Sequence, residues 1–417
     1  MKPGTRLTCG IAALCTLLLF KSFSEPKASF KHSAICSLSD DLSLSEDELA
    51  TIANLIGSST VVALGEATHG TFEETFLRAQ IAKYLITKKG FSIIAIEDQV
   101  AGAEAIDLRL NDEEFDANSI LLNLDFWPWQ NVEMGRLLEW IHKQRAADPN
   151  FKSRFMGFDT QNPFSAAFAL NAMAKEKFGL RFETKREENR RTLRIVGGHE
   201  DDAKDAEDIL VYANSQETEP ILKLYALATY HYFLQLDKPY DREKGMAAVI
   251  RKIRELFPER KMILWGHNVH FAQSSNLPGS RFPALGNYLV EAFGDDYFVL
   301  GLIVGGGSYR AYNFDTGRLD SNTMPDAPDS SVENLLKSTF DGPTLLVVNE
   351  SLNERLMQRL PGSFATEKQF YQRNIKEDYD ALIWIPEAGA SDLIDFSKRR
   401  KQNSNQSVDT TSANDPR

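Results

Sequence analysis

Short apolar runs recur along the chain and alternate with longer segments in which apolar positions repeat with helical spacing. Runs rich in Val, Ile, Leu and Phe are typical of strands buried on both faces. Strands that alternate with helices favour a parallel sheet covered by helices on each side. The sequence therefore predicts an α/β fold with three layers and a mostly parallel central sheet. The predicted strands are residues 60–65, 91–97, 154–159, 261–266, 297–304, 344–349 and 381–386.

The same pattern divides the chain into segments of different character. One α/β domain is expected over residues 45–396. Within it, residues 165–255 carry no convincing strand pattern, which predicts a helical insertion that forms a lid. Residues 25–44 resemble a loose leader, and the polar residues 397–417 are expected to be a disordered tail.

The N-terminus has the pattern of a targeting segment. Lys2 and Arg6 precede an apolar run over residues 7–20, and small residues follow it. This pattern predicts a signal peptide over residues 1–24, cleaved near Ser24, and hence export to the periplasm or the outside of the cell. An uncleaved N-terminal membrane anchor is the alternative.

Composition and charge narrow the classes of partner. The net charge of −12 disfavours binding to the phosphate backbone of nucleic acids. After residue 30 there is no apolar run of about 18 residues, so stable membrane insertion of the mature chain is not expected. Cys36 would be the only cysteine left after cleavage, which leaves no internal disulfide. We expect a monomer.

Charged and imidazole side chains follow the predicted strands. In open α/β sheets, ligands bind outside the carboxyl ends of the strands. A single histidine at such a place is more often structural than catalytic, but several strand ends here carry suitable side chains. They are Glu66, His69, Glu97, Asp159, His267, Asn268, His270 and Arg310.

The stretch "GEATHG" at residues 65–70 is the most informative of these strand ends, because it places Glu66 and His69 in one turn before a predicted helix. Glu73 follows near the helix start, where an anion is favoured, and we expect it to reach the imidazole. We expect Glu74 to point instead toward solvent or toward Arg78, four residues on.

Several chemistries lack their usual motifs. The chain has no G-x-S-x-G elbow, no H-E-x-x-H and no P-loop, and Cys36 is expected outside the core. The remaining pattern is a histidine whose position and charge are set by neighbouring carboxylates, and this pattern suits general-base activation of water. An arginine or a second histidine can then stabilise an oxyanion. A metal site formed by the histidines and carboxylates stays an alternative.

Seven segments taken together resemble the erythromycin esterase family, in the order of that family's motifs. The resemblance covers roughly residues 50 to 315 and continues more weakly to about 390. The segments are "GEATHGTFEETFLR", "GFSIIAIE", "FWPWQNVEMGRLLEWI", "FMGFD", "DREKGMA", "ILWGHNVHF" and "LGNYLVEAFGDDYFVLGLIVGGGSYRA".

The resemblance implies an α/β fold with a helical section and hydrolysis of a macrolide lactone without a metal or other cofactor. It implies that His69 activates water, that Glu66 and Glu73 are its acids and that Arg78 is the family's arginine. The family's late histidine falls on His267 or His270. Our candidate catalytic residues are His69, Glu66, Glu73, Arg78 and His267, and our candidate substrate-binding residues are Glu97, Asp159, His270, Trp127, Trp129 and Arg310.

The sequence therefore favours an exported, metal-independent esterase that acts on a lactone or another small carboxylic ester. Two alternatives remain at this point. One is a protein on the same scaffold that binds haem or another small molecule through its histidines, and the other is a metal-dependent hydrolase.

Overall fold

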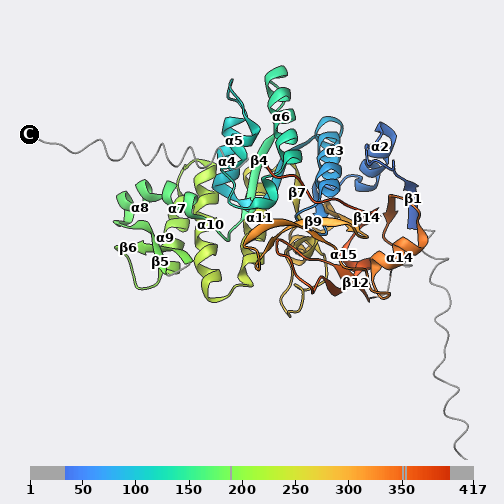
Figure 1. The fold of residues 1–417 in the computed structure, drawn as a ribbon. Helices are drawn as coiled ribbons and strands as arrows, with labels where there is room; N and C mark the ends of the chain where they lie inside the picture. The colour runs from blue at the N-terminus through green and yellow to red at the C-terminus, as the bar shows by residue number, and fades with distance from the viewer. Residues whose placement is uncertain (1–32, 188–189, 350–351, 353–354, 395–417) are drawn as a thin grey trace, which may run out of the picture.

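The computed structural model describes residues 33–187, 190–349, 352 and 355–394 (Figure 1). The predicted signal peptide, its cleavage point near Ser24 and the predicted tail at 397–417 lie outside the described residues. Among the residues that are described, no helix combines the length and the apolar character needed to cross a membrane.

An eight-stranded sheet forms the centre of the molecule, with the order β1-β11-β14-β8-β2-β7-β3-β4. Neighbouring strands from β14 to β4 run parallel, whereas β11 is antiparallel to both β14 and β1. All seven predicted strands are present, which confirms the α/β fold with a mostly parallel sheet. Their bounds are β2 Val61–Glu66, β3 Phe91–Gln99, β4 Arg154–Asp159, β7 Lys261–His267, β8 Tyr297–Val304, β11 Thr344–Val347 and β14 Ala381–Ile385.

Helices cover both faces of this sheet. Alternate side chains of one strand enter different cores: Val62 and Leu64 pack with α2, α3 and α6, whereas Val61 and Ala63 pack with α11, α13 and α14. The helices of the main body are α2 Glu46–Ile56, α3 Phe72–Lys89, α4 Val100–Arg109, α5 Ala117–Leu121, α6 Val132–Ala147, α11 Asp241–Leu256, α12 Asn268–Phe271, α13 Leu285–Phe293, α14 Val332–Thr339 and α15 Ile375–Asp378. Two 3₁₀ turns are η2 Trp127–Trp129 and η3 Gly294–Asp296.

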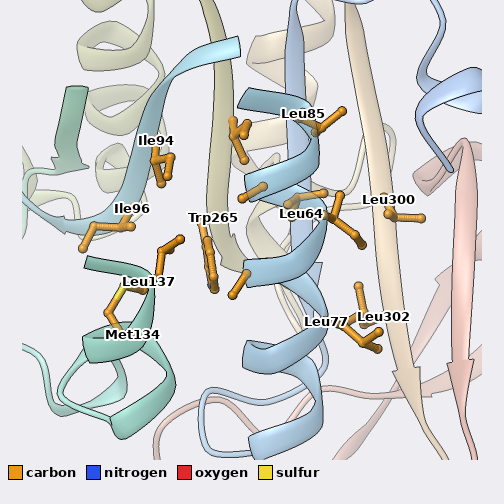
Figure 2. Packing of buried hydrophobic residues seen from close by; sticks show 14 of the residues in the cluster. Leu64, Leu77, Leu85, Ile94, Ile96, Met134, Leu137, Trp265, Leu300 and Leu302 are labelled. Carbon is orange, nitrogen blue, oxygen red and sulfur yellow. The ribbon is translucent and has the colours of Figure 1, made fainter. Parts of the chain in front are cut away.

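Helix α3 connects the GEATHG turn to the core. It begins after Thr71 and ends at Lys89, and the residue that caps it, Gly90, has a left-handed φ of 74° that suits a glycine. Leu77 and Leu85 pack on the sheet beside Leu64, as Figure 2 shows. Because this face of α3 is buried, the helix register decides which carboxylates of its first turn can enter the protein.

The segment 165–255 is not wholly helical, which corrects the expectation from the sequence. A β-hairpin of β5 and β6 lies between its helices, and Phe182, Leu193 and Ile195 enter a small core of this segment's own. Because these three residues are the buried apolar positions described in the two strands, the period of two was too short to be recognised. The elements are α7 Phe164–Ala169, α8 Asn171–Phe178, β5 Arg181–Glu187, β6 Arg190–Val196, α9 Asp202–Ser215 and α10 Pro220–Asp237. Figure 1 shows the hairpin and helices α7, α8 and α9 at one end of the molecule, with α10 between them and the main body.

The expected loose leader also contains an element of the sheet. Strand β1 Ala34–Ser37 pairs with β11 at the edge, and Cys36 packs partly buried against the core rather than outside it. Two further hairpins were not predicted: β9 Ser308–Asn313 with β10 Arg318–Thr323, and β12 Arg355–Arg359 with β13 Phe370–Asn374.

Candidate active site

A cavity of about 480 Å³ lies at the carboxyl ends of β2, β3, β4 and β7. Two chemically different sets of residues line it. The ionisable set is His69, Glu97, Asp159, Arg242 and His270, and the aromatic set is Phe126, Trp127, Trp129, Tyr312 and Phe364. The cavity thus combines a charged floor with apolar walls, at the sheet edge where the sequence predicted a site.

Glu66, His69 and Arg78 form one hydrogen-bonded group at the end of β2. Oε1 of Glu66 lies 2.7 Å from Nδ1 of His69, and Arg78 donates to Oε2 of the same carboxylate. A carboxylate can only accept, so Nδ1 carries a proton, and in the neutral form of the ring the lone pair is on Nε2. No described residue forms a hydrogen bond with Nε2, and the ring lines the cavity with 9% of the residue exposed.

Arg78 is fully buried beneath this pair. Its guanidinium lies 4.6 Å from the ring centroid of Trp265, and its Nε donates to the carbonyl of Glu74 at 3.1 Å. Burial lowers the pKa of Arg78, while the charges of Glu66 and Glu74 oppose that shift. Arg78 therefore acts through Glu66 and does not itself face the cavity.

The positions of Glu73 and Glu74 in the first turn of α3 are the reverse of those expected from the sequence. Glu74 is fully buried and accepts hydrogen bonds from the amide of Ala67 at 2.5 Å and from the hydroxyl of Thr71 at 2.7 Å. Glu73 instead accepts from the amide of Gly389 at 2.7 Å and lines a separate cavity. Helix α3 packs with Glu74 inward, so Glu73 does not support His69.

Burial, and then the nearby charge of Glu66, raise the pKa of Glu74 to about 8. Glu74 is therefore largely protonated at neutral pH. It holds the GEATHG turn in place without adding a second negative charge beside the pair of Glu66 and His69.

His267 is placed as a structural neighbour of the cavity rather than as part of its lining. Its Nδ1 accepts from the amide of Val269 at 3.1 Å, so its Nε2 donates to the carbonyl of Ala67 at 2.9 Å. Burial, followed by the charges of His69 and His270, holds the pKa of His267 well below its usual value. Both nitrogens of this neutral ring are engaged, which disfavours the catalytic role expected from the sequence.

Arg242 connects the acids at the ends of β3 and β4. Its Nε and Nη2 bind both oxygens of Asp159 at 3.0 and 2.7 Å, and Nη2 also lies 2.9 Å from Oε1 of Glu97. Burial works against the charge of Arg242, but Asp159 and Glu97 raise its pKa above the usual range. A bidentate pair of this kind fixes the guanidinium in orientation as well as in charge.

His270 lies between two carboxylates. Its Nδ1 is 2.9 Å from Oε2 of Glu243, and its Nε2 is 3.2 Å from Oε1 of Glu97. Burial alone would lower the pKa of His270, but Glu243 and Glu97 raise it to about 10. The imidazole is therefore a fixed cation at neutral pH. Burial opposes ionisation of Glu97 too, yet His270, His69 and Arg242 hold its pKa well below the usual value.

The remaining candidates divide between the cavity wall and the scaffold. Trp127 and Trp129 line the cavity, and Nε1 of Trp129 donates to the carbonyl of Glu97 at 2.9 Å. Arg310 does not line it: its Nε donates to the carbonyl of Ser391 at 3.1 Å. The structure thus gives Arg310 a contact in the scaffold and none with the cavity.

Sequence reasoning did not single out Arg242 or Glu243 as site residues, nor Phe126, Tyr312 or Phe364. Arg242 and Glu243 begin α11 within the quoted segment "DREKGMA", and this segment was the available signal. The described part of the chain contains no group of three or more His, Cys, Asp or Glu arranged to hold a metal ion.

Comparisons with known proteins agree with this fold. The sequence profile of the erythromycin esterase family matches residues 86–388, more than half of the chain, so the chain belongs to that family. YbfO of Bacillus subtilis (strain 168), provisionally named a hydrolase, is 22% identical, and the match covers 85% of this chain and 90% of YbfO. The family and this relative place the chain among hydrolases.

Solved structures share the fold at low identity. A protein from Bacillus cereus has a TM-score of 0.72 at 20% identity, over 88% of this chain and 99% of its own. A succinoglycan biosynthesis protein has a TM-score of 0.73 at 18% identity, over 89% and 98%. A mutant of erythromycin esterase EreC in its open conformation has a TM-score of 0.64 at 16% identity, over 86% and 99%. At these identities the likeness concerns the fold alone.

Proposed function

We propose that this hydrolase cleaves a carboxylic ester or a lactone with a water molecule activated by Nε2 of His69. One observation carries the proposal: Glu66 holds the protonated Nδ1 of a cavity-lining imidazole whose Nε2 no described residue occupies. This arrangement is that of a general base, because the lone pair faces the cavity and the carboxylate stabilises the imidazolium that forms.

In the proposed reaction, Nε2 of His69 takes a proton from water while the oxygen attacks the carbonyl carbon of the ester. The tetrahedral oxyanion forms beside Arg242 and His270, which line the cavity and supply fixed positive charge. The C–O bond to the leaving alkoxide then breaks, and the His69 imidazolium returns the proton to that oxygen. Ester and water become acid and alcohol, and the histidine regains its initial state.

The substrate class follows from the two sides of the cavity. The acids Glu97 and Asp159 are paired with Arg242 and His270, so the floor leaves no excess charge for a strongly ionic substrate. The aromatic walls favour a substrate with an apolar face. A macrolide lactone satisfies both conditions, and membership of the erythromycin esterase family makes it the first substrate to test.

The test uses purified protein with erythromycin and with 4-nitrophenyl acetate, and measures the acid released. We expect hydrolysis of at least one substrate, with the rate retained in EDTA. A His69→Ala sample purified in parallel excludes a contaminating esterase. Absence of acid from every ester and lactone would refute the function, and loss of activity in EDTA that zinc restores would favour a metal hydrolase.

We also propose that the chain is exported, on the basis of the basic and apolar pattern of residues 1–24. N-terminal sequencing of protein from the producing cell should begin close to residue 25. A sequence that begins at Met1 or Lys2 would reject this proposal.

A further inference from the structure

Three aromatic side chains form a surface cluster at the mouth of the active-site cavity. Phe314 and Phe364 stack with ring centroids 5.2 Å apart and an interplanar angle of 19°. Tyr312 meets them edge-on, at 5.3 Å from Phe314 and 6.4 Å from Phe364. Phe314 is 70% exposed and Phe364 is 51% exposed. We call these three residues the aromatic platform.

The platform continues the wall of the catalytic cavity. Tyr312 and Phe364 line the cavity together with Trp127 and Trp129, and Phe314 extends this apolar surface outward. Single exposed apolar residues are common on soluble proteins, but contiguous aromatic rings beside a cavity are typical of a binding surface. The stacked rings are therefore placed to meet the part of a ligand that extends out of the cavity.

Backbone hydrogen bonds hold the platform in a defined shape. The amide of Tyr312 donates to the carbonyl of Ser363 at 3.0 Å, and the amide of Ala365 donates to the carbonyl of Tyr312 at 2.9 Å. Phe314 lies in a turn where the side chain of Asn313 accepts from the amide of Asp315 at 2.8 Å. The rings are presented by a preorganised backbone, which reduces the entropy lost when a ligand binds.

Both platform segments are also attached to the catalytic turn. The amide of Arg310 in β9 donates to the carbonyl of Gly70 at 2.8 Å, and the hydroxyl of Thr68 donates to the carbonyl of Gly362 at 3.3 Å. A Cβ at Gly70 would lie only 1.9 Å from the carbonyl oxygen of Arg310, so this contact requires glycine. The distance between His69 and the platform is thereby fixed by the scaffold.

We propose that the aromatic platform binds the distal, uncharged and apolar part of a large amphipathic substrate whose reacting carbonyl lies at His69. This inference rests on the proposed function for the placement of the carbonyl. Binding becomes more favourable when flat apolar rings bury an apolar surface of the ligand, and less favourable when they remove water from a charged group. The platform would therefore select by size and apolarity, whereas the cavity floor carries out the chemistry.

The experiment measures equilibrium binding of two amide probes that differ in reach, N-(4-nitrophenyl)acetamide and N-(4-nitrophenyl)decanamide. Amides replace the esters so that binding can be measured without turnover. Quenching of tryptophan fluorescence reports occupancy, because Trp127 and Trp129 line the cavity. In Phe314→Ser and in Phe364→Ser, the Kd of the decanamide should rise about three- to tenfold. In Phe314→Ser, whose residue does not line the cavity, the Kd of the acetamide should stay the same, and Phe314→Trp should retain wild-type affinity for both probes.

Matched controls are Leu108→Ser and Val211→Ser, which remove apolar side chains that are 63% and 62% exposed away from the platform. Neither should change the affinity for either probe. Equal weakening of both probes by Phe314→Ser, no weakening of the decanamide by either platform variant, or the same weakening by the controls would overturn the proposal. Two alternative occupants of the platform are a second copy of the chain and a lipid surface. If a platform variant keeps its affinity for the decanamide but loses dimerisation or binding to phosphatidylcholine vesicles, that other occupant is shown and the proposal is overturned.

The same proteins distinguish the failure of this inference from the failure of the proposed function. If the wild type hydrolyses neither 4-nitrophenyl acetate nor 4-nitrophenyl decanoate but the probes bind as expected, the platform stands and the esterase assignment fails. If both esters are hydrolysed and the platform variants treat them as the wild type does, the esterase stands and the platform fails.

Discussion

The ends of β2 and β7 both bring histidines to the same edge of the sheet, but the surrounding groups leave the imidazoles in different states. At the end of β2, one carboxylate holds Nδ1 of His69 and no described residue occupies its Nε2. At the end of β7, His267 uses both nitrogens on backbone groups, and His270 lies between Glu243 and Glu97. Only the first arrangement can accept a proton from water without breaking an existing contact.

The difference shows how one cavity can hold a base and fixed positive charge together. The pKa of His270 is raised to about 10, so it stays protonated, whereas the pKa of His267 is held low, so it stays neutral. Position in the strand-end pattern therefore does not identify the catalyst. The number of ring nitrogens already engaged distinguishes His69, the proposed base, from His267 and His270.

The largest effect is expected at Glu66. Glu66→Gln removes the negative charge that stabilises the His69 imidazolium and leaves the buried Arg78 without its charged partner. We expect kcat to fall by about 10²–10⁴, the range for loss of positioned proton transfer. Steady-state kinetics give kcat, and circular dichroism confirms the fold. Wild-type kcat in the folded variant would show that the β2 end is structural.

A smaller effect, on stability, is expected at His270. Its pKa is raised from 6.5 to about 10, so the native state keeps a proton that the unfolded state loses above pH 6.5. The contribution of His270 is fully present below that pH and is lost as pH rises through 10. The unfolding free energy of the wild type should therefore decline between these values by a few kcal/mol.

The control for this decline is His270→Gln, which has no proton to lose in the same window. Urea unfolding at intervals between pH 6 and 10 should give a flatter curve for the variant than for the wild type. Parallel curves of unfolding free energy against pH would show that His270 is not a fixed cation. The contrast between His270 and His69 would then have no basis.

The smallest effects on kcat are expected at the two glutamates of α3, Glu73 and Glu74, and their order reverses the expectation from the sequence. The pKa of Glu74 is about 8 instead of 4.5, so the native state holds an extra proton between these values and stability falls as pH rises through them. Glu74→Gln should remove that decline, which for a pKa shift of this size is a few kcal/mol, and lower kcat less than about tenfold.

Glu73→Gln is the matched comparison, since Glu73 binds the amide of Gly389 and lines another cavity. It should leave kcat close to that of the wild type. A larger loss of kcat in Glu73→Gln than in Glu74→Gln would contradict the placement of these two side chains and restore the original expectation.

The predicted strands were found because burial on both faces leaves a continuous apolar signal, as in β8. The hairpin of β5 and β6 was missed because the buried face described for it has only Phe182 in β5 and Leu193 and Ile195 in β6, which is too few apolar residues to show a period of two. Edge strand β1 was missed for a related reason, since its burial alternates over only four residues.

Within the site, Glu66 and His69 could be predicted because they lie three residues apart in one turn. Glu73 and Glu74 could not be told apart, because the sheet-facing side of α3 depends on tertiary packing. Arg242 is far in sequence from both of its partners, Glu97 and Asp159, and only the folded sheet brings them together. Local patterns thus located the edge of the sheet, but tertiary structure determined which groups meet there.

The most direct test of the central claim is the kcat of His69→Ala on an ester that the wild type hydrolyses. We predict that kcat falls by about 10²–10⁴ while the circular dichroism spectrum and the midpoint of unfolding stay close to those of the wild type. A folded His69→Ala protein with kcat within about twofold of the wild type would show that the unoccupied Nε2 of His69 is not the base.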